Sequence, residues 1–305
     1  MAPRREFKEI TVVVPWQASE AVENFLVELE ALGTSIESFD LEDSTETVRG
    51  YFPEDKPMGE LEGSVKAYLK AIKGYFPSPA HWQFSMRVLA DKDWQETWKV
   101  FFRPIRVSRR IVIRPTWEPY EARGKEIIIT IDPGMAFGTG LHATTRLCLE
   151  VIDREIDRRI RGNLRKGNRG LSFLDVGTGS GILAIAAARL GASLVMGIDI
   201  DETAIEVARQ NLRRNAVEGV VRIGSENLEA IDGCFDLVVA NIDFSTLAQL
   251  KGPLTAHVSP GGWLVLSGIV KKQRKSLREI FEGEGLGLAQ EKSRQGWSCL
   301  VFEHS

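Results

Sequence analysis

Residues 173–201 read FLDVGTGSGILAIAAARLGASLVMGIDID, and this stretch decides the fold. A hydrophobic strand ends at Asp175 and is followed by three alternate glycines, an alanine-rich helix and a second strand that ends at Asp199. Glycines here let the backbone turn sharply and let a ligand approach where any side chain would block it. The pattern predicts an open α/β sheet that binds a nucleotide-like ligand at the carboxyl ends of its strands.

The spacing of the glycines disfavours a dinucleotide. A dinucleotide fingerprint, G-x-G-x-x-G, would place its third glycine at position 182, which is Ile182. Asp175 lies beside the turn instead, where it can meet a ligand ammonium directly or through water. Asp199 follows Gly177 by 22 residues, where an acidic side chain can accept both hydroxyls of a ribose. Together these features favour S-adenosylmethionine over NAD.

Two further segments carry candidate site residues. DPGMAFGTGLHATTRLCLE, residues 132–150, is rich in glycine and contains Phe137 and Thr145, so we expect a lid over a ligand. Taken singly, Phe137 also fits a core position and Thr145 a helix cap. In FDLVVANIDFSTL, residues 235–247, Asn241 ends a buried strand. A polar residue there is often a cap, but in a sheet that binds S-adenosylmethionine this position faces the transferable methyl group.

The rest of the chain predicts three parts. Residues 1–90 read as strand, helix, strand, strand, helix, strand, which is the ferredoxin-like order. The first helix is expected over residues 19–33, capped by Ser19 and stopped by Gly33. Residues 91–125 are dense in Trp, Phe, Arg and Pro and predict a packed interdomain linker. From residue 126 to 305 strands alternate with helices, which predicts a mainly parallel sheet with helices on both faces.

Composition and charge narrow the classes of function. The 305 residues are 43% hydrophobic and 27% charged, which is typical of a soluble globular protein of two domains. No apolar run approaches the roughly 18 residues that span a membrane, and three scattered cysteines predict a reduced, cytoplasmic protein without a metal site. Residues 1–90 carry 9 basic and 15 acidic groups, whereas residues 91–125 carry 9 and 5. An acidic first domain repels phosphate and can dock a basic protein, although a solvated acidic surface is the simpler interpretation.

The motifs resemble the PrmA family of bacterial methyltransferases, which act on ribosomal large-subunit protein eleven. Residues 132–145 match the family's loop D-P-G-x-A-F-G-T-G-x-H-x-T-T, and the resemblance extends to WKVFFRPIRVSRRIVIRPTW, GIDID, VVANI and LSGI. It implies a Rossmann-like, class I S-adenosylmethionine methyltransferase domain behind a small ferredoxin-like substrate-recognition domain. The predicted cofactor-binding residues are Phe137, Thr145, Asp175, Gly177, Gly179, Asp199 and Asn241.

The same resemblance implies an activity and a partner. We expect methylation of lysine side chains, of the N-terminal amine, or of both, on a basic ribosomal protein, with Asn241 as the catalytic residue that orients the amine. We expect a cytoplasmic monomer that binds neither membranes nor specific nucleic-acid sequences.

Two departures from the family pattern and three alternatives stay open at this point. The family continues after A-N-I with small and apolar residues, but this chain has Asp243, which either caps the next helix or attracts the substrate ammonium. The segment between Thr145 and Asp175 is longer and more basic than expected, and its residues 154–169 predict a solvated helix end and loop. The alternatives are a methyltransferase for another protein lysine or a small molecule, an NAD-dependent oxidoreductase, and a non-catalytic ribosome-binding protein.

Overall fold

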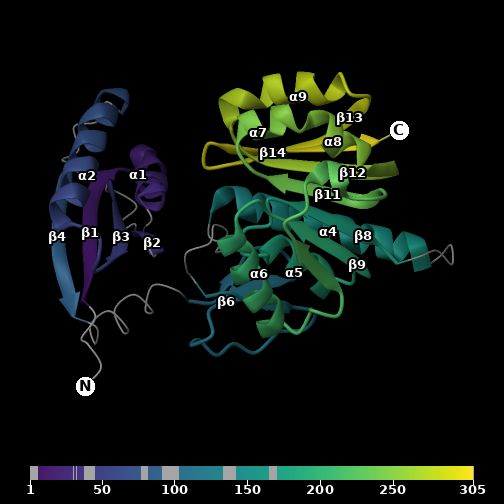
Figure 1. Cartoon of the computed structure of the whole chain (residues 1–305), viewed down its shortest axis with the longest axis horizontal. Coiled ribbons are helices and arrows are strands. Elements are labelled where there is room, and N and C mark those ends of the chain that lie inside the picture. Colours follow the sequence, from purple (N-terminus) through teal and green to yellow (C-terminus); the bar gives the residue numbers. More distant parts are fainter. Residues whose placement is uncertain are drawn as a thin grey trace. The chain divides into compact units, whose positions relative to one another are not determined.

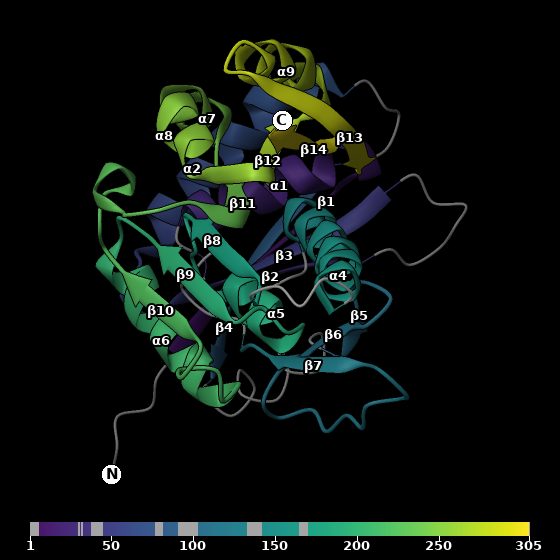
Figure 2. The same ribbon diagram turned by 90° about the vertical axis from the view of Figure 1, so that its right-hand side faces the viewer.

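The computed structural model describes residues 6–29, 31, 33–37, 45–76, 82–90, 103–132, 142–164 and 170–304. The chain forms two compact units (Figures 1 and 2). The first comprises Met1–Arg103 and Pro133–Met135, and the second comprises Pro104–Asp132 and Ala136–Ser305. No helix in the described part of the chain is long and apolar enough to cross a bilayer.

The first unit is a four-stranded antiparallel sheet with the strand order β2-β3-β1-β4. Its elements follow the chain as β1 (Glu6–Pro15), α1 (Trp16–Glu28), β2 (Gly33–Glu37), β3 (Thr45–Pro53), α2 (Met58–Ile72), a 3-10 turn (Lys73–Tyr75) and β4 (Gln83–Ala90). One hydrophobic cluster joins the two helices to the sheet, with fully buried residues such as Val12, Leu26 and Phe52. This element order confirms the predicted ferredoxin-like arrangement.

The predicted ends of the first helix were wrong. Helix α1 begins at Trp16, directly after Pro15, so Ser19 lies inside it and its Oγ donates a hydrogen bond of 2.7 Å to the Trp16 carbonyl. The proline ring fixes φ and removes an amide that the helix start would leave unpaired. At the other end, the helix closes after Glu28, and Gly33 starts β2.

The second unit is built on a seven-stranded sheet with the order β10-β9-β8-β11-β12-β14-β13. Six of the strands share one direction and β14 runs against its neighbours β12 and β13. The strands are β8 (Ser172–Val176), β9 (Leu194–Ile198), β10 (Val221–Gly224), β11 (Phe235–Asn241), β12 (Val258–Val270), β13 (Leu286–Arg294) and β14 (Trp297–His304). The strand order reverses between β8 and β11, and the ends of strands at such a point are where α/β sheets bind ligands.

Helices cover both faces of this sheet, as predicted (Figure 1). One face packs against α4 (Ala143–Leu164), α5 (Ile182–Arg189) and α6 (Glu202–Arg214), and the other against α7 (Phe244–Gln249), α8 (Lys251–Ala256) and α9 (Arg274–Glu282). Each face has its own hydrophobic core, because side chains point alternately to the two sides of a strand. Phe173 and Leu174, neighbours on β8, accordingly belong to different cores.

A small second sheet differs from the sequence prediction. Strands β5 (Ile105–Arg106), β6 (Ile111–Arg114) and β7 (Ile127–Thr130) pair with one another and not with the main sheet. Ile111 and Ile129 are fully buried in the core beneath α4 and α5. The structure therefore assigns residues 104–125, the larger part of the predicted linker, to the second unit, whereas residues 91–102 lie outside the described ones.

The basic segment at the end of α4 packs more than predicted. The guanidinium groups of Arg158 and Arg159 lie 4.7 and 5.7 Å from the ring centroid of Trp263, and Arg159 donates a 2.6 Å hydrogen bond to the Gly261 carbonyl. The helix continues to Leu164, and these two arginines cover the side of β12. Residues 165–169 lie outside the described part.

Candidate active site

The turn after β8 depends on glycine. Gly177, Gly179 and Gly181 have φ values of 72°, 54° and 79°, a region that other residues rarely adopt. The amides of Gly177 and Thr178 both donate to the Ile198 carbonyl at 2.9 Å, which ties the turn to the end of β9. A Cβ on Gly177 would lie 2.4 Å from Cγ2 of Ile242, so no side chain fits there.

Asp199, at the end of β9, braces the same turn. Its Oδ2 accepts a 2.8 Å hydrogen bond from the Gly179 amide, and its Oδ1 accepts one of 3.1 Å from the Asp201 amide. A carboxylate has about four acceptor positions, so each oxygen can take a further donor such as a ribose hydroxyl. The next side chain, Ile200, is 99% exposed, which leaves an apolar surface directly beside this carboxylate.

Asp175 lies beneath the turn and is fully buried. Thr178 Oγ1 donates to its Oδ2 at 2.8 Å. Burial penalises the charged carboxylate and raises the pKa of Asp175 to about 7, with a further upward contribution from Asp199 and an opposing one from the Thr178 hydrogen bond. Asp175 is therefore a buried carboxyl group that changes charge near neutral pH.

We predict that Asp175→Asn changes the pH dependence of stability. Because folding raises the pKa, the contribution of Asp175 is fully present below about pH 4 and is lost as the pH rises through about 7. The free energy of unfolding of the wild type should therefore fall relative to that of the variant between about pH 4 and about pH 7, and the difference between the two proteins should be constant above about pH 8. Denaturant titrations of both proteins across this range measure the difference, and parallel profiles would contradict the assignment.

Asn241 and Thr145 meet at the end of β11. Asn241 Nδ2 donates to Thr145 Oγ1 at 3.4 Å, and Thr145 is 1% exposed in the first turn of α4. Asn241 Oδ1 is buried and has no hydrogen-bond partner among the residues that the structure describes. A buried carbonyl oxygen without a donor costs about 1–3 kcal/mol, so this atom fits a donor that arrives with a ligand.

Two neighbours complete the described part of this edge. The imidazole of His142 bonds Thr144 Oγ1 at 2.7 Å through Nδ1 and packs edge-on against Trp297, with 4.9 Å between the ring centroids. Burial lowers the pKa of His142 to about 4, so this ring is neutral at physiological pH. Thr145 lies inside α4 and its hydroxyl accepts from Asn241, so the simple capping interpretation of Thr145 was wrong.

Asp243 is the N-cap of α7. Its Oδ1 accepts from the amides of Ser245 and Thr246 at 2.9 and 3.1 Å, and hydrogen bonds from these two residues lower its pKa to about 2. Of the two interpretations of this departure from the family pattern, the structure favours capping.

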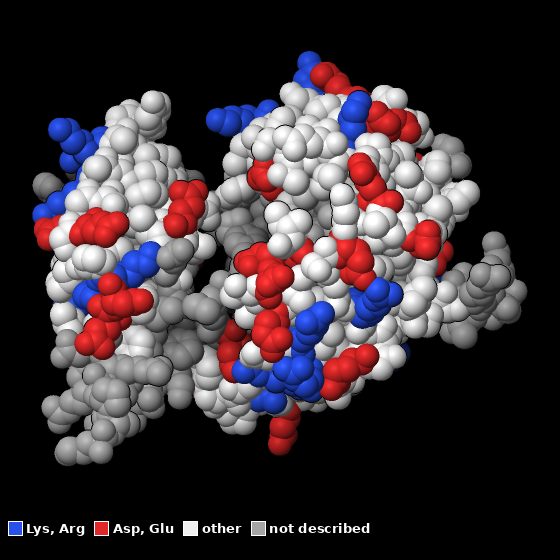
Figure 3. All heavy atoms as spheres, viewed as in Figure 1, with Lys and Arg blue, Asp and Glu red and all other residues white. Residues whose placement is uncertain are grey.

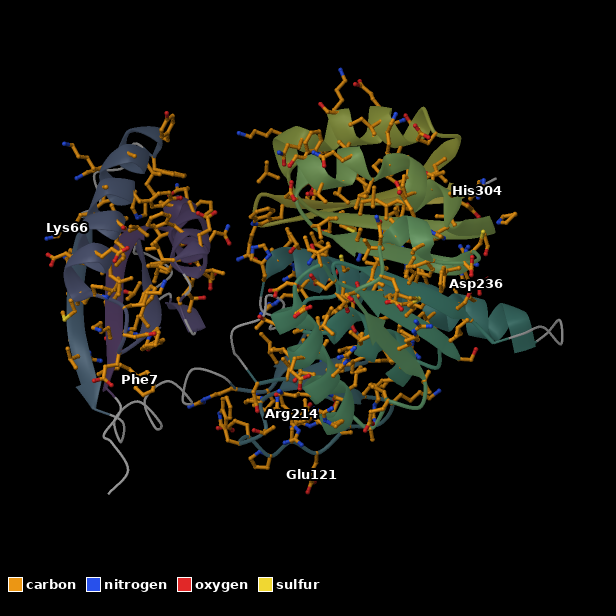
Figure 4. The ribbon with its side chains drawn as sticks, viewed as in Figure 1. Phe7, Lys66, Glu121, Arg214, Asp236 and His304 are labelled. Atoms are coloured by element: carbon orange, nitrogen blue, oxygen red, sulfur yellow. The ribbon has the colours of Figure 1, made fainter. Side chains whose placement is uncertain are left out.

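The strand register gathers most of the predicted residues at one edge. Asp175 is the penultimate residue of β8 and Gly177 follows this strand, Asp199 follows β9 and Asn241 ends β11, and these parallel strands are neighbours in the sheet. Phe137 lies outside the described residues. Asp236, at the opposite ends of these strands, accepts bonds of 2.9 Å from the amide and hydroxyl of Ser172 (Figure 4).

Sequence reasoning missed two residues at this edge. Ile200 could have been found, because it is an apolar residue between two acids at a strand end. Trp297 carried no local signal: it reaches His142 only because β14 inserts between β12 and β13.

The sheet has a glycine turn after β8, a carboxylate after β9 and, on β11, an asparagine whose carbonyl oxygen has no hydrogen-bond partner among the described residues. This combination defines a class I methyltransferase that uses S-adenosylmethionine. Residues 6–305 match the family described as Ribosomal protein L11 methyltransferase (PrmA), and the chain belongs to this family. It is 39% identical over 306 residues to the ribosomal protein L11 methyltransferase of Geobacter sp. (strain M21), covering 97% of this chain and 98% of that protein. The same enzyme of Geobacter sulfurreducens is 39% identical over 312 residues, covering 98% and 99%.

A solved structure agrees with this assignment. The ribosomal protein L11 methylase of Lactobacillus delbrueckii subsp. bulgaricus is 32% identical and superposes with a TM-score of 0.59, covering 67% of this chain and all of that chain. The family membership confirms the resemblance read from the motifs and excludes the NAD-dependent alternative. Ile182, at the position of the third dinucleotide glycine, is 2% exposed and belongs to the core.

Proposed function

We propose that this protein transfers methyl groups from S-adenosylmethionine to amino groups of ribosomal protein L11. The observation that carries the site assignment is the buried Asn241 Oδ1, which lacks a donor among the described residues and lies where β11 meets the glycine turn. S-adenosylmethionine, when bound, supplies a methyl group on a positively charged sulfur. The protein's own residues then have to hold the donor, admit the amine and align it.

We assign the donor site to the carboxyl edge of β8 and β9. Asp199 would accept the ribose hydroxyls, and Ile200 would cover one face of the adenine. Gly177 and Gly179 let the ligand approach the backbone. Asp175 would meet the ligand ammonium directly or through water, and Thr145 would contact the ligand from the first turn of α4. Phe137 is kept as a proposed cofactor residue on the sequence motif alone.

Asn241 is proposed to orient the acceptor. A lysine amine is ordinarily protonated, with a pKa near 10.4, and a protonated amine has no lone pair to donate. Entry into a desolvated site favours the neutral amine, because burial disfavours the charged form. Asn241 Oδ1 would then accept an N–H of the amine and point its lone pair along the direction of transfer.

The first unit is proposed to recognise the substrate. Its sequence carries 15 acidic and 9 basic groups up to residue 90, which suits a basic ribosomal protein. On the face shown in Figure 3 its described side chains carry both signs, so we expect the docking to depend on local patches and not on uniform charge. We further propose that the enzyme works as a cytoplasmic monomer.

Incubating the purified enzyme with L11 and labelled S-adenosylmethionine tests the proposal. Label should appear on L11 and depend on the enzyme. Transfer to other basic proteins at the same rate would favour the broader alternative of a general protein-lysine methyltransferase.

We predict that Asp199→Ala weakens binding of S-adenosylmethionine by roughly 1–3 kcal/mol, because two ligand hydroxyls lose a charged acceptor. Asp199 also holds the Gly179 amide at 2.8 Å, so the variant loosens the turn as well. Asp199→Asn keeps an acceptor for that amide and should lose less affinity. Calorimetry on the three proteins measures the series, and unchanged affinity in the alanine variant would remove Asp199 from the site.

A further inference from the structure

The second unit contains a cleft with a volume of about 480 Å³ that the proposed reaction does not use. Strand β5, the β5–β6 turn, the turn before β7 and helix α4 contribute its lining, which consists of Arg106, Arg109, Arg110, Arg123, Lys125, Glu126 and Asp157. Five of the seven side chains are basic and two are acidic. All seven are charged, so the lining carries a formal excess of three positive charges (five minus two), although the chain as a whole is slightly acidic.

Two of the basic residues form ion pairs with carboxylates that line or adjoin the cleft. Arg106 pairs with the buried carboxylate of Glu126. Arg110 pairs with Asp153 at 2.6 Å and with Asp157 at 3.3 Å, and its side chain is only 16% exposed. These contacts fix β5, β6 and α4 around the opening.

The other three basic residues present their charge to solvent. Arg109 contacts Asp157 at 3.3 Å, but its side chain is 69% exposed, and ion pairs of this kind are weak. Arg123 and Lys125 make no ion pair among the described residues. They flank Gly124, whose φ is 60°, in a turn held by a 2.7 Å bond from the Arg123 amide to Glu126.

The lining indicates which ligand fits. Sites for small organic molecules are lined mainly by apolar and aromatic side chains, whereas none of these seven residues is apolar or aromatic. Guanidinium groups bind phosphate oxygens through paired N–H donors. Contacts confined to phosphates position a nucleic acid without reading its sequence. The neighbouring Glu121 points away from the body of the unit and into solvent (Figure 4).

We propose that this cleft binds the phosphate groups of an RNA backbone, with Arg109, Arg123 and Lys125 as the principal contacts. This inference rests on the proposed function, because a substrate that is a ribosomal protein is bound to RNA in the ribosome. The contact would hold the enzyme on a complex of L11 with ribosomal RNA and would add nothing to methylation of free L11. It is independent of sequence and therefore agrees with the expectation that the protein reads no specific nucleic-acid sequence.

The test uses the full-length enzyme and a labelled single-stranded RNA of mixed sequence. We expect Arg123→Glu/Lys125→Glu to raise the Kd for this RNA about tenfold and to make the salt dependence shallower by about 0.7 per lost cation in log Kd against log salt. Lys271→Glu/Lys272→Glu makes the same change in charge at exposed positions of the second unit outside the cleft, and should bind RNA like the wild type. Both variants should methylate free L11 at the wild-type rate, while the cleft variant alone loses activity on an L11–RNA complex.

Several results would overturn the proposal. They are unchanged RNA affinity in the cleft variant, an equal loss in the control variant, or loss of activity on free L11, which would make the cleft part of the protein-docking surface. Competition by inorganic triphosphate at the same concentration of phosphate as RNA would assign the cleft to a small anion instead. RNA binding is measured without S-adenosylmethionine or L11, so failure of the methylation proposal would leave this result readable on its own.

Discussion

Asn241→Ala is expected to lower kcat for methylation of L11 by about 100-fold, the scale on which loss of alignment slows a transfer reaction. The affinity for S-adenosylmethionine should change only a few-fold, because the Asn241 carbonyl acts on the amine in the transition state and not on the donor in the ground state. The structure supports this division. Asn241 Nδ2 donates a hydrogen bond to Thr145, whereas its Oδ1, which has no partner among the described residues, can accept an N–H of the substrate amine.

A neighbouring substitution provides the control. Asp243→Asn, two residues away, keeps a side chain that can accept from the Ser245 and Thr246 amides, so α7 stays capped. This variant should have nearly wild-type kinetics at low and at high salt. Stopped-flow or steady-state rates together with calorimetry separate the two effects. If Asn241→Ala weakened donor binding as much as it slowed turnover, Asn241 would be a cofactor ligand only.

Removal of the first unit, Met1–Arg103, is expected to lower kcat/KM for L11 by about 100-fold or more and to leave the affinity for S-adenosylmethionine close to that of the full chain. The loss corresponds to an interface worth roughly 3 kcal/mol. Donor binding should persist because the described site residues, Thr145 to Asn241, all belong to the second unit.

The described cores support this design. Every hydrophobic cluster in the described residues lies within a single unit, so the deletion removes no core side chain from the second unit. Far-ultraviolet circular dichroism and the thermal midpoint of the truncated protein provide the control for folding. Full methylation efficiency on L11 after truncation would show that substrate recognition resides in the second unit.

The parts of the fold that were predictable from the sequence are those encoded locally. The strand that ends at Asp175, the glycine turn and the strand that ends at Asp199 lie within 30 residues, and each step has its own residue pattern. The β-α-β-β-α-β order of the first unit was predictable for the same reason. Asn241 was found because it is a polar residue at the end of a strand and directly follows the apolar run Leu237–Ala240.

The errors arose where tertiary contacts decide the outcome. Strand β13 was not predicted, because its exposed and half-exposed residues give no apolar run and it is held mainly by pairing with β14. Strand β7 looked like a member of the main sheet, and only its partner β6 places it in a separate one. The contact of Trp297 with His142 likewise depends on strand order, which the sequence of either segment does not encode.

The charge pattern of the sequence showed where basic residues are concentrated but not which of them are available to a ligand. The excess of basic residues in 91–125 was visible in the sequence, but the sequence could not show which of them are neutralised. In the structure Arg106 and Arg110 are bound to buried carboxylates, whereas Arg123 and Lys125 flank a glycine turn at the edge of a cleft. The distinction between structural and available charge therefore came only from tertiary contacts, those of β5 with Glu126 and those of the β5–β6 turn with α4.

The central claim is that this protein moves a methyl group from S-adenosylmethionine to nitrogen atoms of L11 at the edge formed by β8, β9 and β11. Mass spectrometry of L11 after incubation with the wild type and with Asn241→Ala tests it most directly. With the wild type, peptides should carry methyl groups on lysine side chains, on the N-terminal amine, or on both, and the variant should produce far fewer in the same time. Absence of methylation with the wild type, or methyl groups on carboxylate or hydroxyl oxygens, would contradict the account.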